Sequence, residues 1–177
     1  MFAIRKAERR DISGIERVMR ESIVGISSRQ YDSAQVASSL QFIAHLDHDL
    51  VNDGTYFVVE SEGEIAGCGG WSRRARLYAG SGSGSDDSRM LDPETEAARI
   101  RAMFVAPRLE RRGIGGMILE RCESDARAAG FRRLELMAML SGEAMYASRG
   151  YRAVESVPAK LEDGTPYPLT RMEKDLE

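Results

Sequence analysis

The sequence is poor in cysteine, proline and tryptophan, and it has no long apolar run. Its 177 residues include two cysteines, five prolines and one tryptophan. Cys68 and Cys122 lie far apart in apolar surroundings, which excludes a disulfide framework or a Cys-x-x-Cys metal site and makes a reducing cytoplasm the simplest location. No segment approaches the roughly 18 apolar residues of a membrane span. The opening residues 1–6 lack the apolar stretch of a signal peptide.

The chain also has no excess of one charge. It carries 25 Lys and Arg against 28 Asp and Glu, a formal net charge of -3. Nucleic-acid binders normally show a basic excess, so neither nucleic acid nor a membrane is an expected partner, and any anion site must be local. Hydrophobic residues make up 42% of the chain, enough to bury a sizeable core, and we expect one domain over 1–177.

Apolar spacing alternates between strand-like and helical along the chain, which predicts an α/β fold. In the first half we expect strands at 2–6, 55–60 and 65–71, and helices at 11–23 and 33–43, the second of which could continue to residue 50. In the second half we expect strands at 97–105, 132–138, 151–157 and 170–174, and helices at 114–129 and 142–149. Between the halves the pattern is lost at 73–96. The Gly/Ser tract at 80–87 predicts a flexible surface loop there, with a functional lid as the alternative.

The best candidate for an anion site is the connection that opens the helix at 114–129. It reads Glu110-Arg111-Arg112-Gly113-Ile114-Gly115-Gly116, and residues 99–112 carry five arginines against one glutamate. The first amides of a helix lack intrahelical acceptors, and glycines let a phosphate approach them. Met117 and Ile118 exclude a P-loop and a dinucleotide fingerprint. A tight strand-to-helix connection without a ligand is the alternative.

In the strand before this loop, the alternation of inward apolar residues is interrupted. Met103 and Val105 share a face, whereas the next inward apolar residue, Ile100, precedes Met103 by three positions instead of two. A β-bulge near Arg101 and Ala102 would restore the alternation. Burial of the strand on both faces would explain the same residues without a bulge.

These residues resemble the GNAT N-acetyltransferases, whose signature is Gln/Arg-x-x-Gly-x-Gly/Ala between a strand and a long helix. Glu110 departs from it at the first position. The resemblance implies a mixed, mostly antiparallel central sheet, flanked by helices and splayed at an acetyl-CoA site. The implied cofactor-binding residues are Met103, Phe104, Val105, Arg111, Arg112, Gly113, Ile114, Gly115 and Gly116.

The segment Ala144–Tyr151 is similar to that family's Phe/Leu-Tyr-x-x-x-Gly-Phe/Tyr motif. By this resemblance Tyr146 lies beside the coenzyme A sulfur and protonates the departing thiolate, while a strand amide near Phe104 or Val105 faces the thioester oxygen. A tyrosine that only packs the helix is the alternative. An attacking amine must also lose a proton, and Glu96 is a candidate base, ahead of Glu60 and Glu64.

The sequence therefore predicts an N-acetyltransferase that moves an acetyl group from acetyl-CoA to a primary amine by direct attack, on a small molecule or a protein. A non-catalytic acyl-CoA sensor is the alternative, and a homodimer is expected because dimers are common.

His45 and His48, beside Asp47 and Asp49, could form a metal-binding face. Since no third group of ligands follows, a solvated helix face is favoured and no metal is expected.

Overall fold

The computed structural model describes residues 1–77 and 88–177. The Gly/Ser tract at 80–87, expected to be a flexible loop, lies outside the described residues. The strands are β1 (Ala3–Lys6), β2 (Tyr56–Ser61), β3 (Glu64–Ser72), β4 (Ala98–Val105), β5 (Arg133–Met139), β6 (Arg152–Val157) and β7 (Leu169–Asp175). The α-helices are α1 (Ile12–Gly25), α2 (Ser33–Phe42), α3 (His48–Asn52), α4 (Ile114–Ala128) and α5 (Glu143–Ser148). The predicted α/β element order is confirmed.

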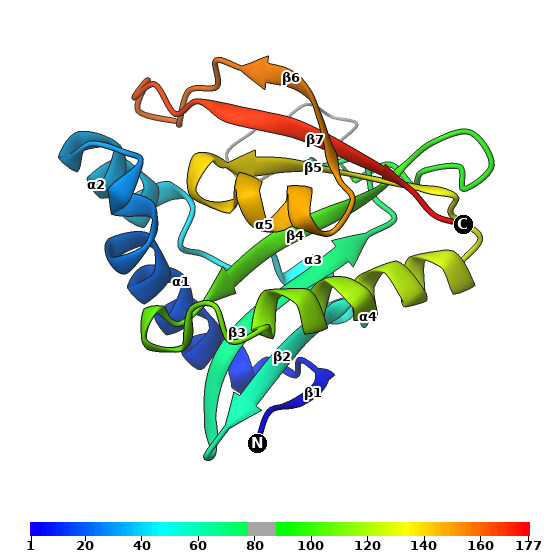
Figure 1. Ribbon diagram of the computed structural model, residues 1–177, viewed down its shortest axis with the longest axis horizontal. Helices are drawn as coiled ribbons and strands as arrows, with labels where there is room; N and C mark the ends of the chain where they lie inside the picture. Colours follow the sequence, from blue (N-terminus) through cyan, green and yellow to red (C-terminus); the bar gives the residue numbers. More distant parts are fainter. Residues whose placement is uncertain (78–87) are drawn as a thin grey trace.

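The strands form one seven-stranded sheet in the order β1-β2-β3-β4-β5-β7-β6. Only β4 and β5 are parallel among the described neighbours, so the sheet is mixed and mostly antiparallel, as expected. Helices α4 and α5 lie on one face, and α1 to α3 lie on the other (Figure 1). Every helix in the described ranges is too short or too polar to cross a bilayer.

Each face of the sheet has its own apolar core, built by one amphipathic helix. On one face α1 contributes Ile15, Val18, Met19 and Ile23, all fully buried against β2 and β3. On the other, α4 contributes its predicted buried stripe of Ile114, Ile118, Leu119 and Cys122. Because helices cover both faces in the described part of the chain, a gap between separated strands is a route to the middle of the sheet.

That gap lies between β4 and β5. The two strands pair only at Ala98↔Leu134 and Arg99↔Glu135, while β5 pairs with β7 from Arg133 to Met139. An ion pair between Arg99 and Glu135 joins the strands at their paired end. Beyond it they diverge, as Figure 1 shows. The predicted splay is therefore present, and the unpaired part of β4 faces a space instead of a strand.

A β-bulge lies at the start of the unpaired part of β4. Cys68 pairs with Phe104 and Gly70 with Arg101, so one residue of β3 opposes two residues of β4. Ala102 has a φ of 52°, a left-handed conformation that a non-glycine residue rarely adopts. The buried Tyr56 hydroxyl donates a hydrogen bond to the carbonyl oxygen of Ala102 at 2.7 Å. The bulge predicted near Arg101 and Ala102 is confirmed.

The helical segment after Ser33 differs from the expectation that it could continue to residue 50. Helix α2 ends at Phe42, and α3 begins separately at His48. The break has a local cause, since the Asp47 carboxylate accepts a hydrogen bond from the amide of Asp49 at 3.0 Å and caps α3. The turn between the two helices brings residues 43–47 next to β4.

We predict that Tyr56→Phe lowers the free energy of unfolding by about 1–3 kcal/mol, because the Ala102 carbonyl loses its buried donor. Urea denaturation measures the change. Tyr151→Phe is the matched control: the Tyr151 hydroxyl bonds Glu123 at 3.2 Å, and Glu123 keeps its ion pair with Lys174 at 2.9 Å. The free energy of unfolding should fall less in Tyr151→Phe than in Tyr56→Phe. Equal stability of Tyr56→Phe and the wild type would contradict the role given to this hydrogen bond.

Candidate active site

The gap between β4 and β5 opens into a cavity of about 630 Å³, a volume typical of ligand sites. Its walls come from the loop before α4, from β4 and β5, and from α5. The predicted site residues that line it are Met103, Phe104, Val105, Arg111, Gly113, Ile114, Gly115, Gly116 and Tyr146. Arg112 is not part of the lining, and its guanidinium lies 5.2 Å from the centre of the Phe2 ring. The structure thus brings the predicted set together, apart from Arg112 and Glu96.

The loop at one end of the cavity presents the start of α4. Gly113 is the N-cap residue with a φ of 84°, which favours glycine, and its carbonyl accepts the first hydrogen bond of the helix from Met117. The amides of the next residues have no acceptor within the helix. With the positive end of the helix dipole, they form a site suited to an anion.

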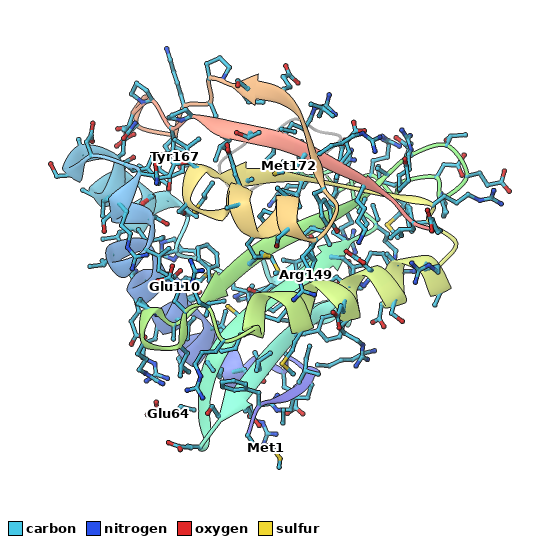
Figure 2. All side chains as sticks on the ribbon, viewed as in Figure 1. Met1, Glu64, Glu110, Arg149, Tyr167 and Met172 are labelled. Carbon is cyan, nitrogen blue, oxygen red and sulfur yellow. The ribbon has the colours of Figure 1, made fainter. Side chains whose placement is uncertain are left out.

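Arg149, the residue directly after α5, adds a positive charge at this end that the motif did not identify. A side chain at Gly116 would meet the Arg149 guanidinium within 2.0 Å, so only glycine there lets Arg149 lie across the first turn of α4. Arg149 lines the cavity and forms an ion pair with Glu120 at 2.8 Å. Figure 2 shows Arg149 above α4. Its place depends on how α5 packs on α4, which no spacing in the sequence reveals.

Glu110 stands where the glycine-loop signature has Gln or Arg, but it does not leave an unpaired negative charge beside the loop. Its carboxylate forms an ion pair with Arg29 at 2.9 Å, just after α1 (Figure 2). The arginines of 99–112 do not form one basic patch either. Arg99 pairs with Glu135, Arg101 with Asp47 and Arg108 with Glu64, so the positive charge of this segment at the loop comes from Arg111 and Arg112. Arg149 lies at the same end but shares its charge with Glu120.

The backbone of β4 directs hydrogen-bonding groups into the gap. The amide of Ala106 donates to the carbonyl of Ala66 on β3 at 2.9 Å. Along an antiparallel pair, successive residues point their N–H and C=O groups alternately toward and away from the partner strand. Val105 therefore turns its amide away from β3, toward the space that β5 leaves.

Tyr146 reaches the cavity from α5. The residue is 8% exposed, and its ring packs edge-to-face against Tyr151, with the ring centroids 5.8 Å apart. Burial, and next the neighbouring Cys122, raise the pKa of the Tyr146 phenol well above its ordinary value. Among the described residues, none forms a hydrogen bond with its hydroxyl. Tyr146 thus offers a neutral O–H donor to whatever occupies the cavity.

The candidate base Glu96 is placed differently. It does not line the cavity, and its carboxylate pairs with Arg89 at 2.8 Å and accepts a hydrogen bond from the Asp92 amide at 2.8 Å. Arg89 is the main cause that lowers the pKa of Glu96 to about 2, which makes this carboxylate a poor proton acceptor. Glu60 and Glu64 also lie outside the lining, paired with Arg5 and Arg108.

The end of the cavity opposite the loop is lined by residues to which no catalytic role was assigned from the sequence. His45 and Asp47, from the turn before α3, lie there with Arg101 of β4. His48 does not line the cavity, and the described residues contain no group of three or more His, Cys, Asp or Glu side chains suited to a metal ion. The signal that could have pointed to Asp47 is its capping position beside a break in the helical pattern.

Comparison with known proteins places this geometry among acetyltransferases. A model described as the Acetyltransferase (GNAT) family matches residues 20–151. No curated protein sequence matches the chain. A GCN5-related N-acetyltransferase structure from Rhodopseudomonas palustris is 18% identical with a TM-score of 0.71, over 98% of this chain and 95% of that one.

Two further solved structures superpose over nearly the whole chain. The PaiA N-acetyltransferase of Thermoplasma acidophilum in complex with coenzyme A is 14% identical with a TM-score of 0.66, over 99% of both chains. The ribosomal-protein-S18-alanine N-acetyltransferase of Escherichia coli is 14% identical with a TM-score of 0.61, over 100% of this chain and 95% of that one. At these identities the likeness is one of fold.

We predict that Tyr146 stays protonated at about pH 10, where an ordinary tyrosine is half ionised. Burial disfavours the charged phenolate, so the native wild type and the Tyr146→Phe variant should show the same tyrosinate absorbance at that pH. Circular dichroism establishes that both remain folded. A lower absorbance in the folded variant, by one tyrosinate group, would show that Tyr146 ionises and is less shielded than its burial indicates.

Proposed function

This chain belongs to the GNAT family of acetyltransferases, and we propose that it transfers the acetyl group of acetyl-CoA to a primary amine by direct attack. The observation that carries the proposal is the cavity itself, where the start of α4, the unpaired end of β4 and Tyr146 meet. Acetyl-CoA supplies an activated thioester. The chain's own residues must bind its diphosphate, hold its carbonyl and stabilise the thiolate that leaves.

The diphosphate fits the loop end of the cavity. Amides at the start of α4 lack intrahelical acceptors, and Arg111 and Arg149 line the same end. Gly115 lines this end without a side chain, so the backbone at the start of α4 stays accessible to a phosphate. The structure of the coenzyme A complex from T. acidophilum has the same fold, which supports this choice of donor.

The thioester carbonyl fits the unpaired part of β4. As the amine attacks, negative charge develops on this oxygen, and a fixed N–H donor stabilises the charge. The Val105 amide faces the gap and belongs to a strand held by β3 and, through the bulge, by Tyr56. A single donor of this kind is typically worth about 100–1,000-fold in rate.

Tyr146 is the proposed partner of the leaving thiolate. The new C–N bond forms as the C–S bond breaks, the amine loses a proton, and the sulfur must gain a proton or a hydrogen bond. A phenol of ordinary pKa about 10 transfers its proton to the thiolate of a thiol near 8.5 only uphill in water. The apolar wall around Tyr146, which includes Met145, raises the pKa of the phenol as well as that of the thiol, so Tyr146 would stabilise the departing sulfur mainly through a hydrogen bond from its neutral O–H.

The acyl-CoA sensor alternative requires a cavity with no space for an acceptor. Here the cavity continues past the bulge to the turn before α3, where His45 and Asp47 line it. This additional space favours an enzyme. Measuring thiol release from acetyl-CoA over a panel of amines separates the two functions. Coenzyme A binding with no turnover on any amine would favour the sensor.

Replacing Tyr146 tests the catalytic assignment. We expect Tyr146→Phe to lower kcat by about 100-fold or more, since a positioned acid typically contributes that much. The KM for acetyl-CoA should change little because the ring remains. Tyr151→Phe is the control, as Tyr151 packs against Tyr146 but lies outside the cavity lining. Equal kcat values for the two variants would remove Tyr146 from the mechanism.

Replacing Glu96 tests the candidate base. If Glu96 accepted the amine proton, Glu96→Gln would lower kcat by about 100-fold or more. Its ion pair with Arg89 and its position outside the cavity lead us to expect an unchanged kcat and an unchanged pH profile instead. A lost acidic limb in the pH profile of kcat would restore Glu96 as the base.

A further inference from the structure

The acceptor end of the cavity, beyond the bulge, contains a buried arginine. The Arg101 side chain is 3% exposed, yet Arg101 lines the cavity. It precedes the bulge residue Ala102, on the face of β4 that turns toward α1 and α3. A buried cation is costly unless charged or polar groups surround its N–H donors, so its partners need explanation.

Those partners are few. Within the described ranges, Arg101 makes one hydrogen bond, from Nη2 to Oδ2 of Asp47, and at 3.4 Å it is long. The same Asp47 oxygen lies 3.4 Å from Nη1 of Arg76, and Oδ1 of Asp47 caps α3 through the Asp49 amide. One carboxylate is therefore shared among three donors. A guanidinium carries five N–H groups, so Arg101 retains donors for a further anion.

We infer that the acceptor is a small amine that carries a carboxylate, and that Arg101 binds this carboxylate through its guanidinium. This inference rests on the proposed acetyl transfer and adds the substrate class. The planar guanidinium matches a carboxylate with two parallel hydrogen bonds. Because Arg101 is buried, the anion must enter the cavity with the amine, which a small molecule does and an internal lysine on a folded protein does not.

The surroundings of Arg101 agree with a short acceptor. Arg101 lies beside the bulge, and Val105, whose amide is proposed to hold the thioester oxygen, follows four residues later on the same strand. Ile43, Leu77 and Met139 line the cavity as apolar groups that suit the carbon chain of such an acceptor. A carboxylate bound at Arg101 fixes one end of the acceptor and leaves its amine free to reach the thioester.

The test compares matched acceptors on the full chain. Amino carboxylic acids of increasing chain length, their carboxamides and the corresponding aminoalkyl phosphates share a primary amine, and rates are expressed per deprotonated amine. We expect kcat/KM to be higher for the carboxylates by about ten-fold or more than for the amides. Equal values for acids and amides would overturn the inference, and a preference for the phosphates would replace carboxylate with phosphate.

Substitutions at Arg101 and at Asp47 have opposite expected effects and assign the preference to Arg101. Arg101→Gln should bring the ratio of kcat/KM for the acids to kcat/KM for the amides near one. Arg101→Lys should lower this ratio less, because the positive charge remains while the planar guanidinium is lost. Asp47→Asn keeps the cap of α3 but removes the competing charge, so KM for the carboxylates should fall. An unchanged ratio of kcat/KM for acids to kcat/KM for amides in Arg101→Gln would contradict the inference.

These outcomes differ from a failure of the proposed function. If the chain does not transfer acetyl groups, no amine is acetylated by the wild type, whatever its substituents. Thermal stabilisation by acetyl-CoA shows whether each variant is folded and binds the donor. Should Arg101→Gln not fold, the wild-type ratio and the Asp47→Asn change still decide the question. A raised KM for carboxylates in Asp47→Asn would count against Arg101.

Discussion

The proposed site depends on the parting of β4 from β5 after two residue pairs. A buried backbone amide without a partner costs about 1–3 kcal/mol, so a strand that leaves its neighbour in mid-sheet must find other partners. On one side β4 keeps β3, and the bulge carbonyl of Ala102 accepts a hydrogen bond from Tyr56. On the other side the donors of β4 face the cavity, where a ligand can use them.

The two ends of the cavity differ in how they hold positive charge. At the loop end the charge is spread over the start of α4, Arg111 and Arg149, beside glycines that leave the backbone accessible. At the acceptor end it is concentrated on the buried Arg101 with a shared carboxylate. The first arrangement suits a large diphosphate at the mouth, and the second suits one small anion inside. The bulge lies between them, where the reacting groups would meet.

Much of this could be predicted from the sequence because it depends on local spacing. The buried stripe of α4 and the bulge indicated by the spacing of Ile100 and Met103 each follow from residues near one another in the chain, and each was confirmed. The alternation of strands and helices likewise predicted the α/β class, whereas the mixed sheet was implied by the family resemblance. Local spacing is informative here because backbone conformation and amphipathic burial are set over a few residues.

Pairings between distant residues were not predictable in the same way. The partner of Glu110 is Arg29, and the guanidinium of Arg149 lies against α4 where Gly116 has no side chain. The five arginines of residues 99–112 do not form one basic patch for the same reason. Arg99 pairs with Glu135 of β5, and Arg101 pairs with Asp47 in the turn before α3. Such contacts depend on the whole sheet, which a motif does not encode.

Amide hydrogen exchange with and without saturating acetyl-CoA tests the central claim most directly, because it reads the backbone donors themselves. The account predicts that exchange slows by about ten-fold or more at Val105 and over the first turn of α4. The amides of the exposed edge strand β6 should be unaffected. Binding of acetyl-CoA with no protection on β4 would contradict the claim that its unpaired end holds the thioester.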